Sequence, residues 1–245
     1  MDLAKLLSLL HSKALYFVRL DKLSQYDPFE GYYTNLKYAF EDSKYEDIPE
    51  QKRIELGINS QGEFDQWKSQ PQKIRELVKR FRPIAFVNSW HLQEHESVAM
   101  WKIYSHGNEG IAIQSTYEGL IESLVSYEEY GVYIGLIKYI DYDKGIIPPN
   151  DVISPYIHKR KSFEYEKELR ALVWTLQDNK NSLEENKYKD DDGFYVPVDM
   201  DKLIDKIYVA PNAPRWVLEI IKAVVDRFEL KKDVIPSSLA STPFY

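Results

Sequence analysis

The chain has 245 residues, of which 44% are hydrophobic and 29% charged, as in an ordinary soluble globular protein. Its formal net charge of −7 argues against a sequence-independent hold on nucleic acid, because phosphate binding needs a cationic face. A local basic patch is compatible with this balance, so nucleic acid is not excluded as a partner. The lack of cysteine excludes a disulfide, a thiolate nucleophile and a cysteine zinc site.

The sequence shows no signal for export or for membrane insertion. The N-terminal segment lacks the basic, apolar and small-residue order of a signal peptide, and the apolar run at 3–10 is too short to span a bilayer. We therefore expect a cytoplasmic protein with no membrane partner. Because no composition shift divides the chain, residues 1–245 are predicted to form a single domain.

Apolar spacing predicts helices and strands interleaved along the whole chain. Helices are expected near residues 2–11, 64–81, 96–105, 120–124 and 214–228, and the third of these is expected to be buried on most of its circumference. Strands are expected near residues 15–20, 84–87, 110–113, 132–142, 169–176, 194–198 and 207–209. This order lacks the strict alternation of a doubly wound sheet, so we predict an α+β fold with a mixed central sheet and peripheral helices. Residues 178–193 are acidic without apolar periodicity, which predicts a mobile loop.

Arg19 is the first residue of chemical interest, because it lies inside an apolar strand and is followed closely by Asp21. A guanidinium that is buried without a partner costs several kcal/mol. The arginine is therefore expected to pair with Asp21, to project from an edge strand or to bind a ligand.

Acidic residues precede the late strand in an alternating pattern. Glu164, Glu166 and Glu168 stand directly before the apolar run, and Arg170 follows two positions on. In extended geometry Glu166 and Glu168 share one face, whereas a helix would spread them. We therefore expect a carboxylate pair at the beginning of this strand.

Residues 91–95 match H-x-x-E-H, the order found in inverted zinc peptidases, in which two imidazoles hold the metal and a glutamate acts as base. That chemistry requires the whole motif within one helix, but His91 directly follows a predicted strand. We therefore expect no metal at these histidines. The chain also lacks G-x-S-x-G, G-x-G-x-x-G and P-loop motifs, which argues against serine hydrolases, Rossmann dehydrogenases and P-loop nucleotidases.

Four spaced motifs, taken together and in order, resemble the bacterial family called domain of unknown function 2971. They are DPFEG at 27–31, SWH at 89–91, ES..MW at 96–101 and F.yE.ELR at 163–170. The family name implies no activity. At the level of the fold, the chain is also similar to ADP-ribosyltransferases, which combine an arginine in the first strand, a serine or threonine at a middle strand and a late glutamate pair. The matching residues here are Arg19, Ser89 (or Ser115 and Thr116), Glu166 and Glu168.

This similarity implies an enzyme that consumes NAD as a substrate, either an ADP-ribosyltransferase or an NAD glycohydrolase, and that needs no metal. The residues that would bind NAD are Arg19, Ser89, Trp90, His91 and Ser115. Glu168 would be the catalytic carboxylate, helped by Glu166, because a carboxylate near the ribose stabilises the oxocarbenium-like transition state. Bacterial enzymes of this type often serve as toxins or in phage defence. The acceptor of the ADP-ribose is left open.

Two alternatives stay beside this hypothesis. One is a metal-dependent hydrolase, a nuclease or peptidase, that uses His91 and His95 or the carboxylates of Asp27, Glu30, Glu166 and Glu168. The other is a binding module without catalysis, in which the charged groups form a paired network. The enzyme hypothesis requires Arg19, His91, Glu166 and Glu168 to converge, with Arg19 lowering the pKa of a nearby carboxylate.

Overall fold

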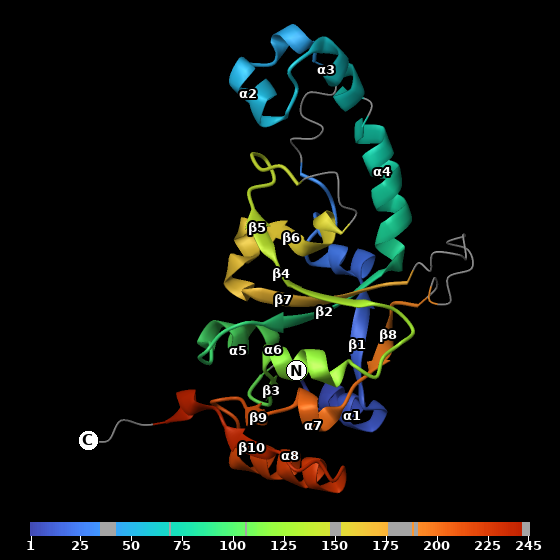
Figure 1. The fold of residues 1–245 in the computed structure, drawn as a ribbon. Helices are drawn as coiled ribbons and strands as arrows, with labels where there is room; N and C mark the ends of the chain where they lie inside the picture. Colours follow the sequence, from blue (N-terminus) through green and yellow to red (C-terminus); the bar gives the residue numbers. More distant parts are fainter. Residues whose placement is uncertain are drawn as a thin grey trace. The chain divides into compact units, whose positions relative to one another are not determined.

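The computed structural model describes residues 1–34, 43–68, 70–105, 107–147, 153–175, 188 and 191–241, with only the backbone described at 55 and 70–75. Most of the predicted loop at 178–193 lies outside these described residues. The predicted α+β class, with mixed sheets and peripheral helices, is confirmed (Figure 1). No helix within the described ranges is long and apolar enough to cross a membrane.

The helices and strands follow the apolar pattern of the sequence in most places. The α-helices are α1 (Leu3–Ser12), α2 (Glu50–Glu55), α3 (Gln61–Lys68), α4 (Gln70–Phe81), α5 (Val98–Tyr104), α6 (Tyr117–Ser123), α7 (Met200–Leu203) and α8 (Arg215–Arg227). The strands are β1 (Ala14–Arg19), β2 (Ala85–His91), β3 (Ile111–Gln114), β4 (Val132–Leu136), β5 (Lys138–Ile140), β6 (His158–Arg160), β7 (Glu168–Trp174), β8 (Gly193–Pro197), β9 (Lys206–Val209) and β10 (Asp233–Pro236). Short 3-10 helices that bear on the site are η5 (Ser154–Ile157) and η6 (Lys161–Glu166).

The strands form three sheets. The largest has the order β4-β7-β2-β1-β8, in which β1 and β2 are antiparallel and Arg19 is opposite Phe86. In the sheet β10-β9-β3, β10 runs parallel to β9 and β3 runs antiparallel to it. The third sheet is a parallel pair, β5 with β6.

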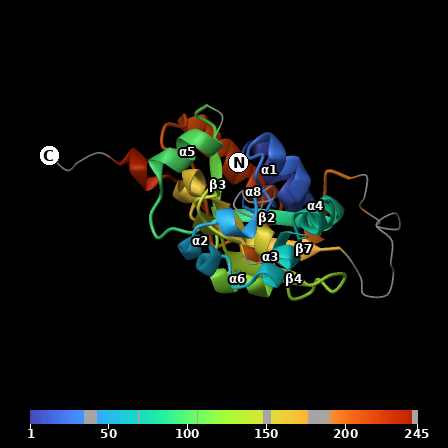
Figure 2. The same ribbon diagram turned by 90° about the horizontal axis from the view of Figure 1, so that it is seen from above.

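Contacts group the residues into two compact units, each made of separate stretches of chain. The first unit consists of Met1–Phe17, His91–Ile134 and Gly193–Tyr245. Its helix α8 begins after Pro214 and buries Val217, Ile221 and Val225 on one face, as the helical spacing predicts. This helix contacts β10 and α1, and Figure 2 shows α1 beside it.

The second unit consists of Val18–Trp90 and Gly135–Asp192. Its main core is built from residues of several segments, namely Leu20, Ala85, Val87, Tyr156 and Leu172. A smaller core lies around α2 and α3 and contains Ile48, Ile58, Phe64 and Trp67. Apolar burial of this kind contributes about 25 cal/mol per Å². Because the main core includes residues of β2 and β7, this burial stabilises the two strands that carry the candidate site.

Three predicted elements differ from the observed ones. The helix predicted over 64–81 is two helices, α3 and α4. The strand predicted over 132–142 is two strands, because β4 pairs with β7 in the largest sheet whereas β5 pairs with β6 in another sheet. The N–H of Ile137, between β4 and β5, donates to the carbonyl of Glu168 in β7 (2.9 Å). The predicted burial of the helix at 96–105 is wrong, because α5 has no buried residue. With seven residues it makes about two turns, so apolar side chains on all its sides cannot all face a core.

Gly31 provides a test of how tightly the second unit is packed. Its φ is +74°, and a Cβ added there would lie 2.6 Å from Leu20 Cδ2 and 3.3 Å from Tyr156 Cδ1, both in the main core. We expect Gly31→Ala to lower the free energy of unfolding by about 3 kcal/mol, combining left-handed strain with overpacking.

The matched control for this variant is Gly57→Ala. Gly57 has a φ of +67° but nothing within 4 Å of the added Cβ, so only the backbone strain applies, about 1 kcal/mol. Urea unfolding of both variants measures the difference. Equal losses for the two variants would show that the space around Gly31 is not tight.

Candidate functional site

A cluster of buried charges lies in the second unit, and we call it the Glu168 cluster. It consists of three carboxylates and two cations, namely Glu30, Glu166, Glu168, Lys159 and Arg170. The chain segments that supply them are the turn at 27–31, strand β6, the end of η6 and strand β7. The side chains of Glu30, Glu168 and Arg170 are each at most 2% exposed.

Glu168 accepts hydrogen bonds at both carboxylate oxygens. Its Oε1 accepts from Arg170 Nε at 2.6 Å and from the hydroxyl of Ser89 at 2.5 Å. Its Oε2 accepts from Lys159 Nζ at 2.8 Å. The backbone N–H of Glu168 donates to the hydroxyl of Tyr139 at 2.8 Å, which holds the first residue of β7 in place.

Lys159 and Arg170 connect the carboxylates to one another. Lys159 Nζ lies 2.6 Å from Glu166 Oε2 and 3.6 Å from Glu30 Oε2, so one ammonium serves three carboxylates. Arg170 Nη1 donates to Glu30 Oε1 and to the carbonyl of Tyr156, both at 2.7 Å. Charge-assisted hydrogen bonds of this kind are about twice as strong as neutral ones.

These contacts set the ionisation of the cluster. Burial alone raises the pKa of Glu168, but the charges of Arg170 and Lys159 and their hydrogen bonds outweigh burial, so the pKa falls from 4.5 to about 2. Burial alone lowers the pKa of Lys159, and the charges of Glu168 and Glu30 reverse this, so its pKa is raised. Glu168 and Lys159 are therefore both charged at neutral pH.

The two predicted catalytic glutamates come together, but not in the predicted way. Glu166 is the last residue of η6, and Lys167 then adopts a left-handed conformation with φ of 42° before β7 begins at Glu168. The expected extended alternation is therefore wrong at Glu166. The left-handed turn at Lys167, rare for a residue other than glycine, brings both carboxylates to Lys159.

Ser89 is the NAD-binding candidate that the structure joins to Glu168. It lies on β2, is exposed, and still donates its hydroxyl to the buried carboxylate. The next residue, Trp90, donates its indole N–H to Asn88 Oδ1 at 2.6 Å. Ser89 is therefore an exposed residue that is hydrogen-bonded to the Glu168 cluster.

Arg19, His91 and Ser115 make other contacts. Arg19 Nε binds Asp21 Oδ1 at 2.8 Å, which is the ordinary pairing that the sequence also allowed. The cations that lower the pKa of Glu168 are Arg170 and Lys159, where the sequence pointed to Arg19.

His91 and Ser115 belong to the first unit. Nε2 of His91 is 2.8 Å from Gln93 Oε1, and the hydroxyl of Ser115 donates to the carbonyl of Thr116 at 3.2 Å. Their roles toward NAD stay predictions. The H-x-x-E-H motif begins at the end of β2 and not inside a helix.

Lys159 is the member of the cluster that sequence reasoning missed. It lies in the basic run 158–161, which resembles a solvated surface segment, whereas the three-residue strand β6 buries it. The signal available in the sequence was the number of acidic residues in the turn at 27–31 and just before β7, for which Arg170 alone supplies too few positive charges. Within the described residues there is no group of three or more histidine or acidic side chains arranged to hold a metal ion.

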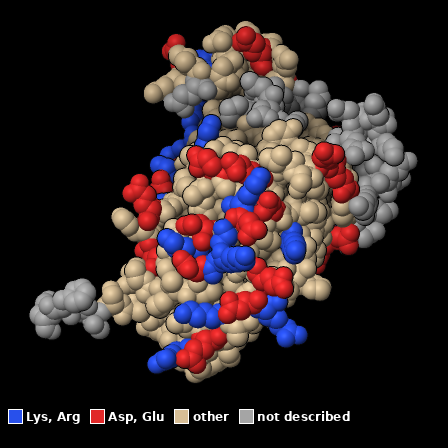
Figure 3. Space-filling view, turned by 60° about the horizontal axis from the view of Figure 1, so that its bottom comes forward, with Lys and Arg blue, Asp and Glu red and all other residues tan. Residues whose placement is uncertain are grey.

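The surface and the comparisons with known proteins add little to this geometry. On the face shown in Figure 3, Lys and Arg side chains are interspersed with Asp and Glu and do not form one basic area. No protein-family model, curated protein or solved structure matches the chain. Function is therefore inferred from the geometry of the site.

The Glu168 cluster predicts a specific dependence of stability on pH. The folded-state pKa of about 2 lies below the usual 4.5, so the stabilisation is present above pH 4.5 and is lost as the pH falls toward 2. A shift of this size corresponds to about 3 kcal/mol. We expect Glu168→Gln to be less stable than the wild type by about this amount at pH 7, and the difference to shrink steadily below pH 4.5.

Urea unfolding from pH 7 down to about pH 2 measures this difference. Glu164→Gln is the matched control, because Glu164 is an exposed glutamate on η6, just before β7, and its variant should follow the wild type. A Glu168→Gln deficit that stays constant over the acidic range would mean that the carboxylate charge is not what stabilises the cluster.

Proposed function

We propose that the chain is an ADP-ribosyltransferase-like enzyme that consumes NAD, with Glu168 as the carboxylate that stabilises the reacting ribose. The observation that carries this proposal is the 2.5 Å hydrogen bond from the hydroxyl of Ser89, an exposed residue, to Oε1 of Glu168. A sugar hydroxyl is chemically equivalent to that serine hydroxyl. Oε1 of the ionised Glu168 can thus accept a hydrogen bond from a ribose hydroxyl in the same way.

The charge state of Glu168 supports this role. When the bond between ribose C1′ and nicotinamide breaks, positive charge develops on the sugar, and a fixed negative charge nearby stabilises the transition state. The pKa of Glu168, about 2, keeps the carboxylate ionised throughout the physiological range. Such a carboxylate is a weak base, so its proposed role is electrostatic and orienting.

Glu166 supports a second part of the reaction. Its carboxylate shares Lys159 with Glu168 and is more exposed, with 12% of the side chain accessible against 2%. In the proposed step, the electron pair of the C1′–N bond leaves with nicotinamide, and an acceptor oxygen, from water or from another molecule, forms the new bond to C1′. Glu166 takes the proton that the acceptor releases.

The remaining predicted parts of this enzyme rest on the similarity to ADP-ribosyltransferases. The guanidinium of Arg19 binds Asp21, so Arg19 would hold the pyrophosphate of NAD only by binding both groups at once or by releasing Asp21. A setting in phage defence or as a toxin is proposed on the same resemblance.

A binding module without catalysis is the second candidate, and one observation favours it. Both oxygens of Glu168 already accept hydrogen bonds from cations inside the protein. A carboxylate in that state is complete as a structural anchor, and the exposed Ser89 would then mark only the edge of a rigid surface. Three of the four carboxylates proposed for a metal-dependent hydrolase, those of Glu30, Glu166 and Glu168, surround the Lys159 ammonium, which supplies the positive charge at that point. The fourth, that of Asp27, binds Arg160.

The enzyme hypothesis predicts that the protein releases nicotinamide from NAD. We expect Ser89→Ala, which leaves the Lys159 and Arg170 contacts of Glu168 in place, to lower kcat by about tenfold. Glu168→Gln should lower it by about a hundredfold or more, as for the loss of one preorganised electrostatic group. The measurement is chromatographic detection of nicotinamide with water and a panel of nucleophilic acceptors.

Glu164→Gln serves again as the exposed control and should keep the wild-type rate. Circular dichroism at the assay temperature establishes that each variant is folded. A folded wild type that releases no nicotinamide with any acceptor would contradict the enzyme hypothesis and leave the binding module.

A further inference from the structure

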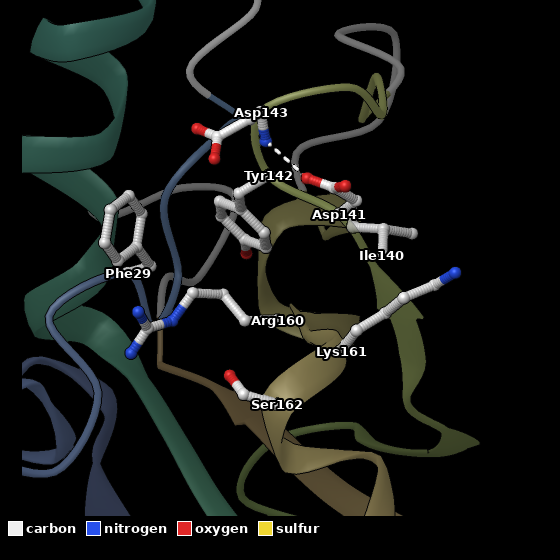
Figure 4. Close-up of a pocket in the computed structure, with 8 residues that line it drawn as sticks. All are labelled: Phe29, Ile140, Asp141, Tyr142, Asp143, Arg160, Lys161 and Ser162. Atoms are coloured by element: carbon white, nitrogen blue, oxygen red, sulfur yellow. Dashed lines mark hydrogen bonds between the residues drawn. The ribbon is translucent and has the colours of Figure 1, made fainter.

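A pocket of about 250 Å³ lies in the second unit beside β5 and β6, apart from the residues of the Glu168 cluster (Figure 4). Residues of both charges line it together with aromatic rings, among them Phe29, Asp141, Tyr142, Asp143, Arg160 and Ser162. This volume lies below the roughly 300–1,000 Å³ of pockets that bind drug-sized ligands. The pocket therefore suits a small molecule and not a whole dinucleotide.

One end of the pocket is cationic and preorganised. The guanidinium of Arg160 binds Asp27 Oδ1 through Nη2 at 2.7 Å and lies 4.7 Å from the ring centre of Phe29 and 5.5 Å from that of Phe163. Its side chain is still 32% exposed. An arginine fixed in this way loses little entropy when it binds a carboxylate. The hydroxyl of Ser162 points toward the same end in Figure 4.

The wall of the pocket is aromatic and rigid. Tyr142 packs edge-to-face against Phe29 at 5.4 Å between ring centres. Its hydroxyl donates to the carbonyls of Tyr32 at 3.3 Å and His158 at 3.4 Å, so the ring cannot swing into the pocket without breaking these bonds. This wall offers an apolar surface to the middle of a ligand.

The other end of the pocket carries the carboxylates of Asp141 and Asp143, and Asp141 Oδ2 lies 3.8 Å from the ammonium of Lys144. Asp141 Oδ1 accepts from the backbone N–H of Asp143 at 3.0 Å, which fixes the two aspartates beside each other. Figure 4 shows the Asp143 carboxylate and the Arg160 guanidinium at opposite ends, with the rings of Phe29 and Tyr142 between them. The pocket thus presents opposite charges across an apolar middle.

From this arrangement we propose that the pocket binds a small zwitterion of the ω-amino acid class. The ligand carboxylate lies on Arg160 and Ser162, its ammonium on Asp143, and its methylene chain on the aromatic wall. A sugar phosphate has a matching anionic end, but it has no cationic group for the carboxylate end of the pocket, which disfavours it. The proposal stands independently of the NAD chemistry, because Arg160 and not the Glu168 cluster carries it.

Calorimetric titration with ε-aminocaproate and its two single-ended analogues, caproate and hexylamine, tests the proposal. We expect ε-aminocaproate to bind at least about tenfold more tightly than either analogue, which corresponds to about 1.4 kcal/mol. Equal binding of caproate and ε-aminocaproate, or no saturation with ε-aminocaproate by about 10 mM, would overturn it.

Two exposed pocket residues make the test specific to each end. Asp143→Asn should weaken ε-aminocaproate and hexylamine by about tenfold and leave caproate unchanged, whereas Ser162→Ala should weaken caproate and leave hexylamine unchanged. Asp201→Asn, at an exposed aspartate on α7 in the first unit, is the matched control and should change nothing. If Asp143→Asn weakened all three ligands alike, the ammonium end would be wrongly placed and the proposal would fail.

Discussion

The buried guanidinium of Arg170 is the constraint on which much of the second unit depends. The side chain is 1% exposed, and a buried cation is tolerated only when carboxylates and hydrogen-bond acceptors surround it. Glu30, Glu168 and the carbonyl of Tyr156 meet this requirement. The turn at 27–31, the 3-10 helix η5 and strand β7 must therefore be assembled together, because removing any one of them leaves the guanidinium with too few partners. Its Nη2 has no hydrogen-bond partner among the residues that the structure describes.

The second cation explains why the cluster can hold three carboxylates. Arg170 neutralises one charge, and Lys159 lies between Glu30, Glu166 and Glu168, so the five groups together carry a formal charge of −1. The excess negative charge is placed where hydrogen bonding from Ser89 and partial exposure of Glu166 reduce its cost. A substrate with developing positive charge would be stabilised at the same place. The structural and the catalytic interpretations therefore both depend on the excess negative charge of the cluster.

Local patterns in the sequence predicted the parts of the fold that depend on local physics. Helix α8 follows from its apolar spacing and the proline before it, and strand β7 follows from its continuous apolar run. The break at Ile137 could not be predicted, because it depends on β4 and β5 pairing with two different strands, β7 and β6, that come later in the chain. Nor could the meeting of Glu166 and Glu168 at Lys159, which depends on a left-handed residue that the sequence does not mark with glycine.

The motifs behind the family resemblance show the same division. Three of the four supply members of the cluster or its contacts, namely Glu30, Ser89, Glu166, Glu168 and Arg170. The fourth forms a separate polar centre in the first unit, where Glu96 Oε1 accepts from the N–H of Ser238 at 2.7 Å and its Oε2 accepts from the indole of Trp101 at 3.0 Å. Sequence reasoning could therefore select the residues, but only the fold shows which of them share a site.

Strand β6 separates the Glu168 cluster from the pocket lined by Arg160 and Asp143. Adjacent residues of a strand point to opposite faces, so Lys159 reaches the cluster and Arg160 reaches the pocket from neighbouring positions. The turn at 27–31 is the other connection, since Asp27 binds Arg160 and Glu30 binds Arg170. Within that turn, Gly31 lies against core residues and leaves little room for the backbone to move. A ligand that moved Arg160 would therefore move the whole turn, because Asp27 is bound to Arg160. Glu30 belongs to the same turn, so its contact with Arg170 in the Glu168 cluster would change as well.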